Sequence, residues 1–231
     1  MKRVLFLGTK DKSDLVVYIG LILRELGFKT LIVDSSIRKK YFRTYTNMEH
    51  NPSLYDFFGV DIISATSEDE LNQVLATYEQ EPEKPYDVLL VDMYEVSESK
   101  GWHEFDERFY VGNQEKISLM EDAELLMKFV KHYPDQSQLN RIVFTLDNQI
   151  EKTYFDQLIH ESVKWGAWDY EVEYNEFDQI NRIQMQYAMR PTFKKLSRNY
   201  KKLLSRLITA LIGFHERDSL KAMKRLNKEG K

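Results

Sequence analysis

Short apolar runs alternate with longer segments of helical periodicity along most of the chain. This alternation predicts βαβ units and a doubly wound, mostly parallel sheet, which is an α/β fold. Strands are expected at 4–7, 30–33, 60–64, 88–91, 141–145 and 170–174, and helices at 14–26, 68–78, 119–131 and 154–163. The run at 88–91 is apolar throughout, as in strands buried on both faces, so we expect it near the centre of the sheet.

The segment 95–112 lacks such a pattern and is expected to be a long loop. It carries four aromatic residues among charges, namely Trp102, Phe105, Phe109 and Tyr110. Loops of this length in compact domains are often functional. The alternative is that the aromatic side chains fold back onto the body of the domain.

The C-terminal region, 191–231, is basic. Between 193 and 212 apolar residues recur at helical spacing among lysines and arginines, which predicts a basic amphipathic helix with a buried leucine stripe. The stretch 217–231 is poorer in apolar residues, and residues 213–231 are expected to bury little and to be dispensable for the fold. We therefore divide the chain into an α/β domain at 1–190 and a C-terminal helical region at 191–231 that packs on it. The acidic residues Glu173, Glu176 and Asp178 are expected to lie in a solvated turn.

Composition narrows the classes of protein. In 231 residues, 42% are hydrophobic and 30% charged, as in soluble globular proteins, and the absence of cysteine excludes disulfides and thiolate metal sites. The longest apolar run, 15–23, is about half of the roughly 20 residues that span a bilayer. The run after Met1 ends at Gly8 and reads as a strand rather than a signal peptide. We expect a cytoplasmic protein, and the net charge of −4 makes nucleic acid an unexpected partner.

The turn after the first expected strand has the position of a phosphate-binding loop, because it leads directly into a helix in a doubly wound domain. In such a loop backbone N–H groups face the phosphates, a lysine reaches their oxygens and a hydroxyl binds Mg²⁺. The predicted cofactor-binding residues are Gly8, Thr9, Lys10, Asp11, Lys12 and Ser13. The usual glycines are replaced by Phe6 and Asp11, and Asp11 puts a carboxylate beside the phosphate position.

Two segments carry a family resemblance. The segment GTKDKSDLVVYIGLILRELGFKTLIVDSS resembles the opening of the MinD/ParA deviant Walker A proteins, KGGxGK[ST] followed by a helix, L-x-x-x-G, a strand and an aspartate. The ungapped match pairs family positions with Gly8, Lys12, Ser13, Gly27 and Asp34. The segment YDVLLVD, ending at Asp92, resembles the Walker B strand, whereas the signature lysine at the start of the loop is replaced by Leu7.

The resemblance implies a P-loop NTPase fold with ATP and Mg²⁺ as cofactors, Asp34 and Asp92 as catalytic residues, and Ser13 and Asp92 as metal ligands. An alternative explanation needs no nucleotide: Ser13 is a good helix N-cap and Asp14 suits the first helical turn.

Three functions stay open. MinD/ParA relatives position or assemble other machinery, including division sites, plasmids, flagella and pili, and atypical loops occur in the pilus-assembly branch. The first hypothesis is a degenerate relative of this kind, a localisation or assembly factor with weak or absent hydrolysis, protein partners, a homodimeric state and peripheral contact with a membrane. The second is a working Mg-dependent ATPase. The third is a DNA-binding partition protein that uses the basic C-terminal face.

Overall fold

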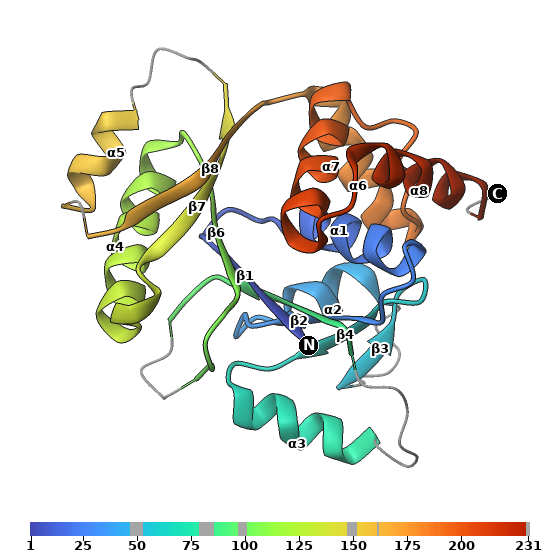
Figure 1. Ribbon diagram of the computed structural model, residues 1–231, viewed down its shortest axis with the longest axis horizontal. Coiled ribbons are helices and arrows are strands. Elements are labelled where there is room, and N and C mark those ends of the chain that lie inside the picture. The colour runs from blue at the N-terminus through green and yellow to red at the C-terminus, as the bar shows by residue number, and fades with distance from the viewer. Residues whose placement is uncertain (47–52, 79–85, 97–100, 147–151, 161, 230–231) are drawn as a thin grey trace.

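A computed structural model describes the chain except for residues 47–52, 79–85, 97–100, 147–151, 161 and 230–231 (Figure 1). The described strands form one eight-stranded sheet in the order β3-β4-β2-β5-β1-β6-β7-β8. Neighbouring strands are parallel except for β3 and β4, which are antiparallel. The prediction of a mostly parallel α/β fold is therefore confirmed, and β5, the apolar run at 88–91, lies in the interior of the sheet.

The strands are β1 Lys2–Leu7, β2 Thr30–Asp34, β3 Leu54–Asp56, β4 Asp61–Ser64, β5 Val88–Met93, β6 Glu107–Asn113, β7 Gln138–Thr145 and β8 Lys164–Glu173. The α-helices are α1 Ser13–Glu25, α2 Lys40–Tyr45, α3 Glu68–Tyr78, α4 Lys116–His132, α5 Lys152–Leu158, α6 Glu176–Ala188, α7 Arg198–Ile212 and α8 Glu216–Glu229. A 3₁₀ turn at Pro134–Gln136 precedes β7.

Alternate residues of the central strands point into two separate apolar layers. In β1, Val4 and Phe6 face the layer that contains α1, α7 and α8, whereas Leu5 and Leu7 face the layer that contains α3, α4 and α5. Figure 1 shows α1, α7 and α8 together on one side of the sheet and α4 and α5 on the other. Both faces of the sheet are thus covered, as expected for apolar parallel strands.

The predicted loop at 95–112 is wrong in part, because β6 lies within it and pairs with β1. Phe109 and Tyr110 are buried on opposite faces of the sheet, and Trp102 and Phe105 are buried in the layer of α3 and α4. Residues 97–100 of the predicted loop lie outside the described residues. The aromatic side chains therefore belong to the core, which was the alternative interpretation.

The leucine stripe of the basic helix is buried against α1, as expected, although α7 begins at Arg198 rather than at residue 193. Ser197 is its N-cap and accepts a hydrogen bond of 3.1 Å from the backbone N–H of Tyr200. The expectation that the last stretch buries little is wrong. Helix α8 packs on α1 and α7 through Ala222, Met223 and Leu226, which lie on one face of the helix. A domain boundary at residue 190 stays a prediction.

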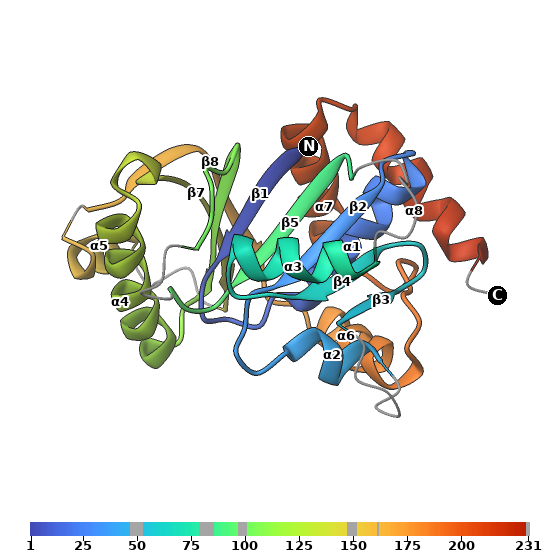
Figure 2. The ribbon, with the colours of Figure 1, turned by 90° about the horizontal axis from the view of Figure 1, so that it is seen from below.

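Helix α6 was missed by the sequence pattern, which predicted a solvated turn around Asp178. The Asp178 side chain is buried and accepts a hydrogen bond of 2.6 Å from the backbone N–H of Ser197. Figure 2 shows α6 beside α2, at the end of the sheet where the parallel strands finish. Among the helices of the described ranges, none combines the length and apolarity that a membrane span requires.

Candidate functional site

The predicted site residues gather at the carboxyl ends of three adjacent parallel strands. In register, Asp92 of β5 lies between Phe6 of β1 and Asp34 of β2. The loop from Gly8 to Ser13 leaves β1 at this edge and enters α1. The structure therefore brings the phosphate-loop residues and Asp92 together.

Glycine is required at the start of the loop. Gly8 has a φ of +150°, and a Cβ atom there would lie 2.2 Å from the carbonyl oxygen of Val111 in β6. Real Cβ atoms do not approach an oxygen so closely, so any other residue forces the loop away from β6.

The ammonium group of Lys12 is fully buried and bonded to the chain itself. Its Nζ lies 2.8 Å from Oδ1 of Asp92 and donates to the carbonyl oxygens of Gly8 at 2.7 Å and Met93 at 3.3 Å. The ring of Tyr94 covers it, with its centroid 3.6 Å from Nζ. This lysine thus faces internal acceptors in the place where a phosphate lysine faces phosphate oxygens.

Asp92 is enclosed by two tyrosine hydroxyls. Its Oδ2 accepts hydrogen bonds from Tyr41 at 2.7 Å and from Tyr94 at 2.9 Å. Burial and the Asp92 carboxylate raise the pKa of both tyrosines well above the usual value, so both hydroxyls stay protonated and donate.

Asp34 organises the turn into α2 rather than the phosphate loop. Its Oδ1 accepts from the backbone N–H and hydroxyl of Ser36 at 3.0 and 2.5 Å, and its Oδ2 accepts from the backbone N–H of Tyr41 at 2.9 Å. Burial raises the pKa of Asp34 above its usual value.

Carboxylates of the chain occupy backbone N–H groups of the loop that would serve phosphate. The N–H of Thr9 donates to Oδ1 of Asp122 at 2.6 Å, and the N–H of Ser13 donates to Oδ1 of Asp11 at 3.1 Å. Asp122 also accepts from the hydroxyl of Tyr110 at 2.9 Å, and burial raises the pKa of this aspartate. Because these carboxylates satisfy the amides, the loop carries its own anions.

The Asp11 carboxylate is held by Arg182 of α6. Burial acts to raise the pKa of Asp11, but Arg182 and the hydrogen bonds from Ser13 outweigh it, so this pKa lies below the usual value. Arg182 also lies 3.7 Å from Asp14 of α1. Lys10 lies over the ring of Phe144 at 4.1 Å, and burial lowers its pKa.

The residues present do not fit Mg-ATP in this arrangement. Lys12 is neutralised by Asp92. The Ser13 hydroxyl is hydrogen-bonded to the Tyr45 hydroxyl at 3.2 Å rather than open to a cation. Within the described part of the chain, no group of three or more His, Asp or Glu side chains is arranged to hold a metal ion.

The interpretation of Ser13 as an N-cap is wrong. Lys12 occupies the N-cap position without a side-chain cap, Ser13 is the first helical residue, and Asp11 accepts the Ser13 N–H instead. Sequence reasoning missed Tyr41, Asp122 and Arg182, and it did not predict the contacts that Tyr94 makes. The bulky Tyr94 after Asp92, where the family has small residues, was the visible signal that the site is filled.

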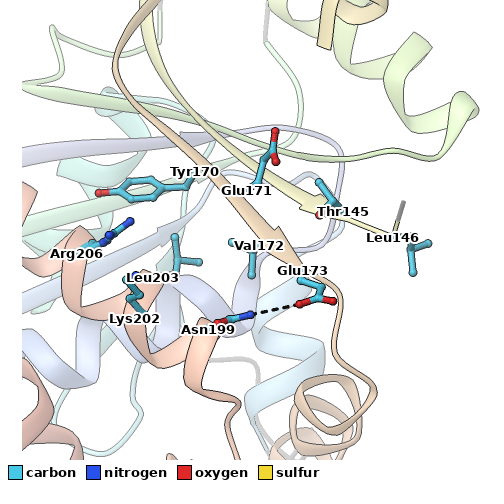
Figure 3. A pocket seen from close by; sticks show the side chains of 10 residues that line it. All are labelled: Thr145, Leu146, Tyr170, Glu171, Val172, Glu173, Asn199, Lys202, Leu203 and Arg206. Atoms are coloured by element: carbon cyan, nitrogen blue, oxygen red, sulfur yellow. Dashed lines mark hydrogen bonds between the residues drawn. The ribbon is translucent and has the colours of Figure 1, made fainter. Parts of the chain in front are cut away.

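A separate cleft of about 710 Å³ lies between β8 and α7, away from the phosphate loop. Figure 3 shows Glu173 of β8 on one side and Lys202 and Arg206 of α7 on the other, with Asn199 hydrogen-bonded to Glu173 at 3.4 Å. The side chain of Glu171 points to the opposite face of β8, where it pairs with Lys152 at 2.7 Å. The lining contains none of the predicted site residues.

Several solved structures share this fold. A ParA family ATPase from Chlorobium tepidum TLS aligns with 88% of this chain and 97% of its own at 15% identity, with a TM-score of 0.57. The fold is that of the MinD/ParA ATPases. An AMPPNP-bound putative plasmid partition protein from Borrelia burgdorferi B31 covers 97% of this chain and 98% of its own at 13% identity and a TM-score of 0.52.

The MinC:MinD cell division protein complex of Aquifex aeolicus also shares the MinD/ParA fold. It covers 80% of this chain and 86% of its own at 13% identity, with a TM-score of 0.52. No protein-family model and no curated protein matches the chain.

Proposed function

We propose that this chain is a degenerate MinD/ParA-like protein that acts as a localisation or assembly factor with weak or absent nucleotide hydrolysis. The observation that supports this most directly is the buried pair of Lys12 and Asp92, which is closed by Tyr41 and Tyr94.

Opening such a site for a nucleotide is expensive. Separating one partner from a buried ion pair costs about 3–5 kcal/mol. If nucleotide binding must supply this energy, its apparent affinity falls by about two to three and a half orders of magnitude. Nucleotide binding in the manner of an intact P-loop is thus strongly disfavoured.

Leu7, which stands at the position of the signature lysine, cannot take over the role of that lysine. Leu7 is fully buried in the layer of α3 and α4 and pairs in register with Met93 and Tyr110. A buried leucine has neither the charge nor the reach to contact phosphates bound to a second subunit, so transition-state stabilisation across a dimer is lost.

A protein partner is proposed by analogy with the MinC:MinD complex among the structural neighbours. We also propose a cytoplasmic location and a homodimer. Peripheral membrane contact through α7 is less favoured, because its apolar face is buried on α1 and α8.

Two of the cations of α7, Lys201 and Arg206, are engaged within the chain, which disfavours nucleic-acid binding through this helix. The Nζ of Lys201 donates to the carbonyl oxygens of Lys194 and Leu196 at 3.1 and 2.7 Å. Arg206 lies 3.7 Å from Glu216. DNA binding that weakens steeply with salt would favour the partition-protein alternative.

Phosphate release from ATP tests the proposal, with Lys12→Ala as the matched variant. We expect the wild type and the variant to release phosphate at the same background rate. Turnover by the wild type that Lys12→Ala abolishes would instead establish the working-ATPase alternative. For the localisation role, a fluorescent fusion of the wild type is expected to form foci that persist after cellular ATP is depleted; diffuse fluorescence before depletion contradicts that role.

A further inference from the structure

Helix α6 carries an apolar stripe that faces solvent. The exposed fractions are 69% for Phe177, 41% for Ile180, 53% for Ile183 and 87% for Tyr187. Their spacing of three and four residues places all four on one face of the helix. The opposite face holds the buried Asp178 and Asn181.

The size of this stripe is that of an interaction surface. At roughly 200 Å² for each large side chain, the four expose on the order of 500 Å², within the range of about 300–600 Å² for the largest apolar patch of a monomer. A specific interface buries about 800 Å² per partner, which the exposed polar residues around the stripe can complete.

The stripe is complementary to itself when the helix is reversed. In an antiparallel pair of α6 helices centred on residue 182, Phe177 lies opposite Tyr187 of the second copy, and Ile180 lies opposite Ile183 and Gln184 of the second copy. Two-fold interfaces require this property, because the same patch is used by both subunits.

Charge at the two ends of α6 favours the same arrangement. Glu173 and Glu176 are exposed at the N-terminal end, and Arg190 and Lys194 are exposed just beyond the C-terminal end. An antiparallel pair places the acidic end of each helix beside the basic end of the other, whereas a parallel pair opposes like charges.

We infer that α6 is the contact helix of a nucleotide-independent, two-fold homodimer of this chain. A membrane surface is a poorer occupant, because anionic lipid repels Glu173 and Glu176 at one end of the stripe. This inference rests on the homodimer proposed above and specifies its contact face. The stripe uses no residue of the phosphate loop, although Arg182 on the opposite side of α6 contacts Asp11.

The first test is the mass of the protein in nucleotide-free buffer, measured by sedimentation equilibrium over a concentration series. We expect a dimer, and we expect Ile183→Glu to weaken dimerisation by about tenfold or more. The matched control is Leu220→Glu, because Leu220 is a 41% exposed residue on α8 and lies outside the stripe. This control should leave the dimer unchanged.

Two further variants test the antiparallel arrangement. Glu176→Lys and Arg190→Glu should each weaken the dimer, and the two together should restore it. Since the chain has no cysteine, a single Ile183→Cys substitution near the two-fold axis should give a disulfide-linked dimer on mild oxidation, while Leu220→Cys should not.

A monomer at all concentrations, a dimer that forms only with Mg-ATP, or a dimer unaffected by Ile183→Glu overturns the inference. Binding of the nucleotide-free protein to anionic vesicles that Ile183→Glu abolishes, without a dimer in solution, assigns the stripe to a membrane and overturns it as well. Phosphate release is measured separately, so failure here overturns the contact face or the homodimer and leaves the proposed loss of nucleotide hydrolysis untouched.

Discussion

Replacing Lys12 with methionine distinguishes a loop that is closed by its own ion pair from a loop that binds a nucleotide. Methionine keeps most of the buried side-chain volume and removes the ammonium group. Asp92 then keeps its hydrogen bonds from Tyr41 and Tyr94, but its Oδ1 loses its ion-pair partner at 2.8 Å in a fully buried position. In a loop that opens to solvent and phosphate, the same substitution removes binding with little effect on stability.

The expected loss is large. Removing one partner of a buried ion pair costs about 3–5 kcal/mol, a substantial part of the 5–15 kcal/mol that stabilises a typical protein. For a chain of this size, 1 kcal/mol lowers the melting temperature by about 2–4 °C, so Lys12→Met should lower it by about 6–20 °C. Differential scanning calorimetry without nucleotide measures this shift.

Two controls make the result specific. Lys40 also lies against the ring of Tyr94, with its Nζ 3.2 Å from the ring centroid. Because Lys40 is only partly buried, Lys40→Met should lower the melting temperature much less than Lys12→Met. In Lys12→Met/Asp92→Asn no unpaired charge remains, and most of the lost stability should return. An unchanged melting temperature in Lys12→Met would show that the ion pair of Lys12 and Asp92 does not stabilise the fold.

Three other substitutions or deletions follow from the same structure. Gly8→Ala should cost about 1–3 kcal/mol through its clash with Val111, in addition to the backbone cost of its positive φ. Gly27→Ala, at φ +94° in open space, should show only the backbone cost of about 1–2 kcal/mol, so equal losses of the two variants in chemical denaturation would contradict the close approach. The raised pKa of Asp122 means that the folded state holds a proton more tightly than the unfolded state. The contribution of Asp122 to the free energy of unfolding therefore falls as the pH rises from the ordinary pKa of 3.8 through the raised pKa. Asp122→Asn should flatten this part of the profile of stability against pH, and a steeper profile would be inconsistent with the raised pKa. Deleting residues 214–231 should lower the free energy of unfolding by about 3–6 kcal/mol, because Met223 and Leu226 are buried against α1 and α7. An unaltered unfolding midpoint would show that α8 contributes nothing to stability.

The sequence pattern predicts the fold well where apolar residues are buried in the usual way. The helix expected at 68–78 agrees with α3, and the strands expected at 30–33 and 88–91 lie within β2 and β5. It fails for α6 because the pattern there is reversed: polar Asp178 and Asn181 are buried, while Phe177 and Tyr187 are exposed. The exposed apolar residues of α6 do recur at helical spacing, but a rule that places apolar residues inside assigns their face to the core instead of to solvent.

The sequence predicts where the candidate site lies, but it does not predict that the groups of the site are paired with one another. The register of Lys12, Asp34 and Asp92 along parallel strands was enough to place them at one edge of the sheet. The groups that close the loop come from distant segments, Tyr41 from α2, Asp122 from α4 and Arg182 from α6. Their convergence is a tertiary property, so single-sequence reasoning could identify Asp11 and Leu7 as departures but not the contacts that replace phosphate.

We propose that the phosphate loop binds the chain's own carboxylates instead of a nucleotide. Calorimetric titration of the purified wild type with Mg-ATP tests it most directly. We expect no heat of binding in the concentration range where intact P-loop proteins saturate. Tight, saturable binding that is lost in Lys12→Ala, with the variant still folded, would contradict it.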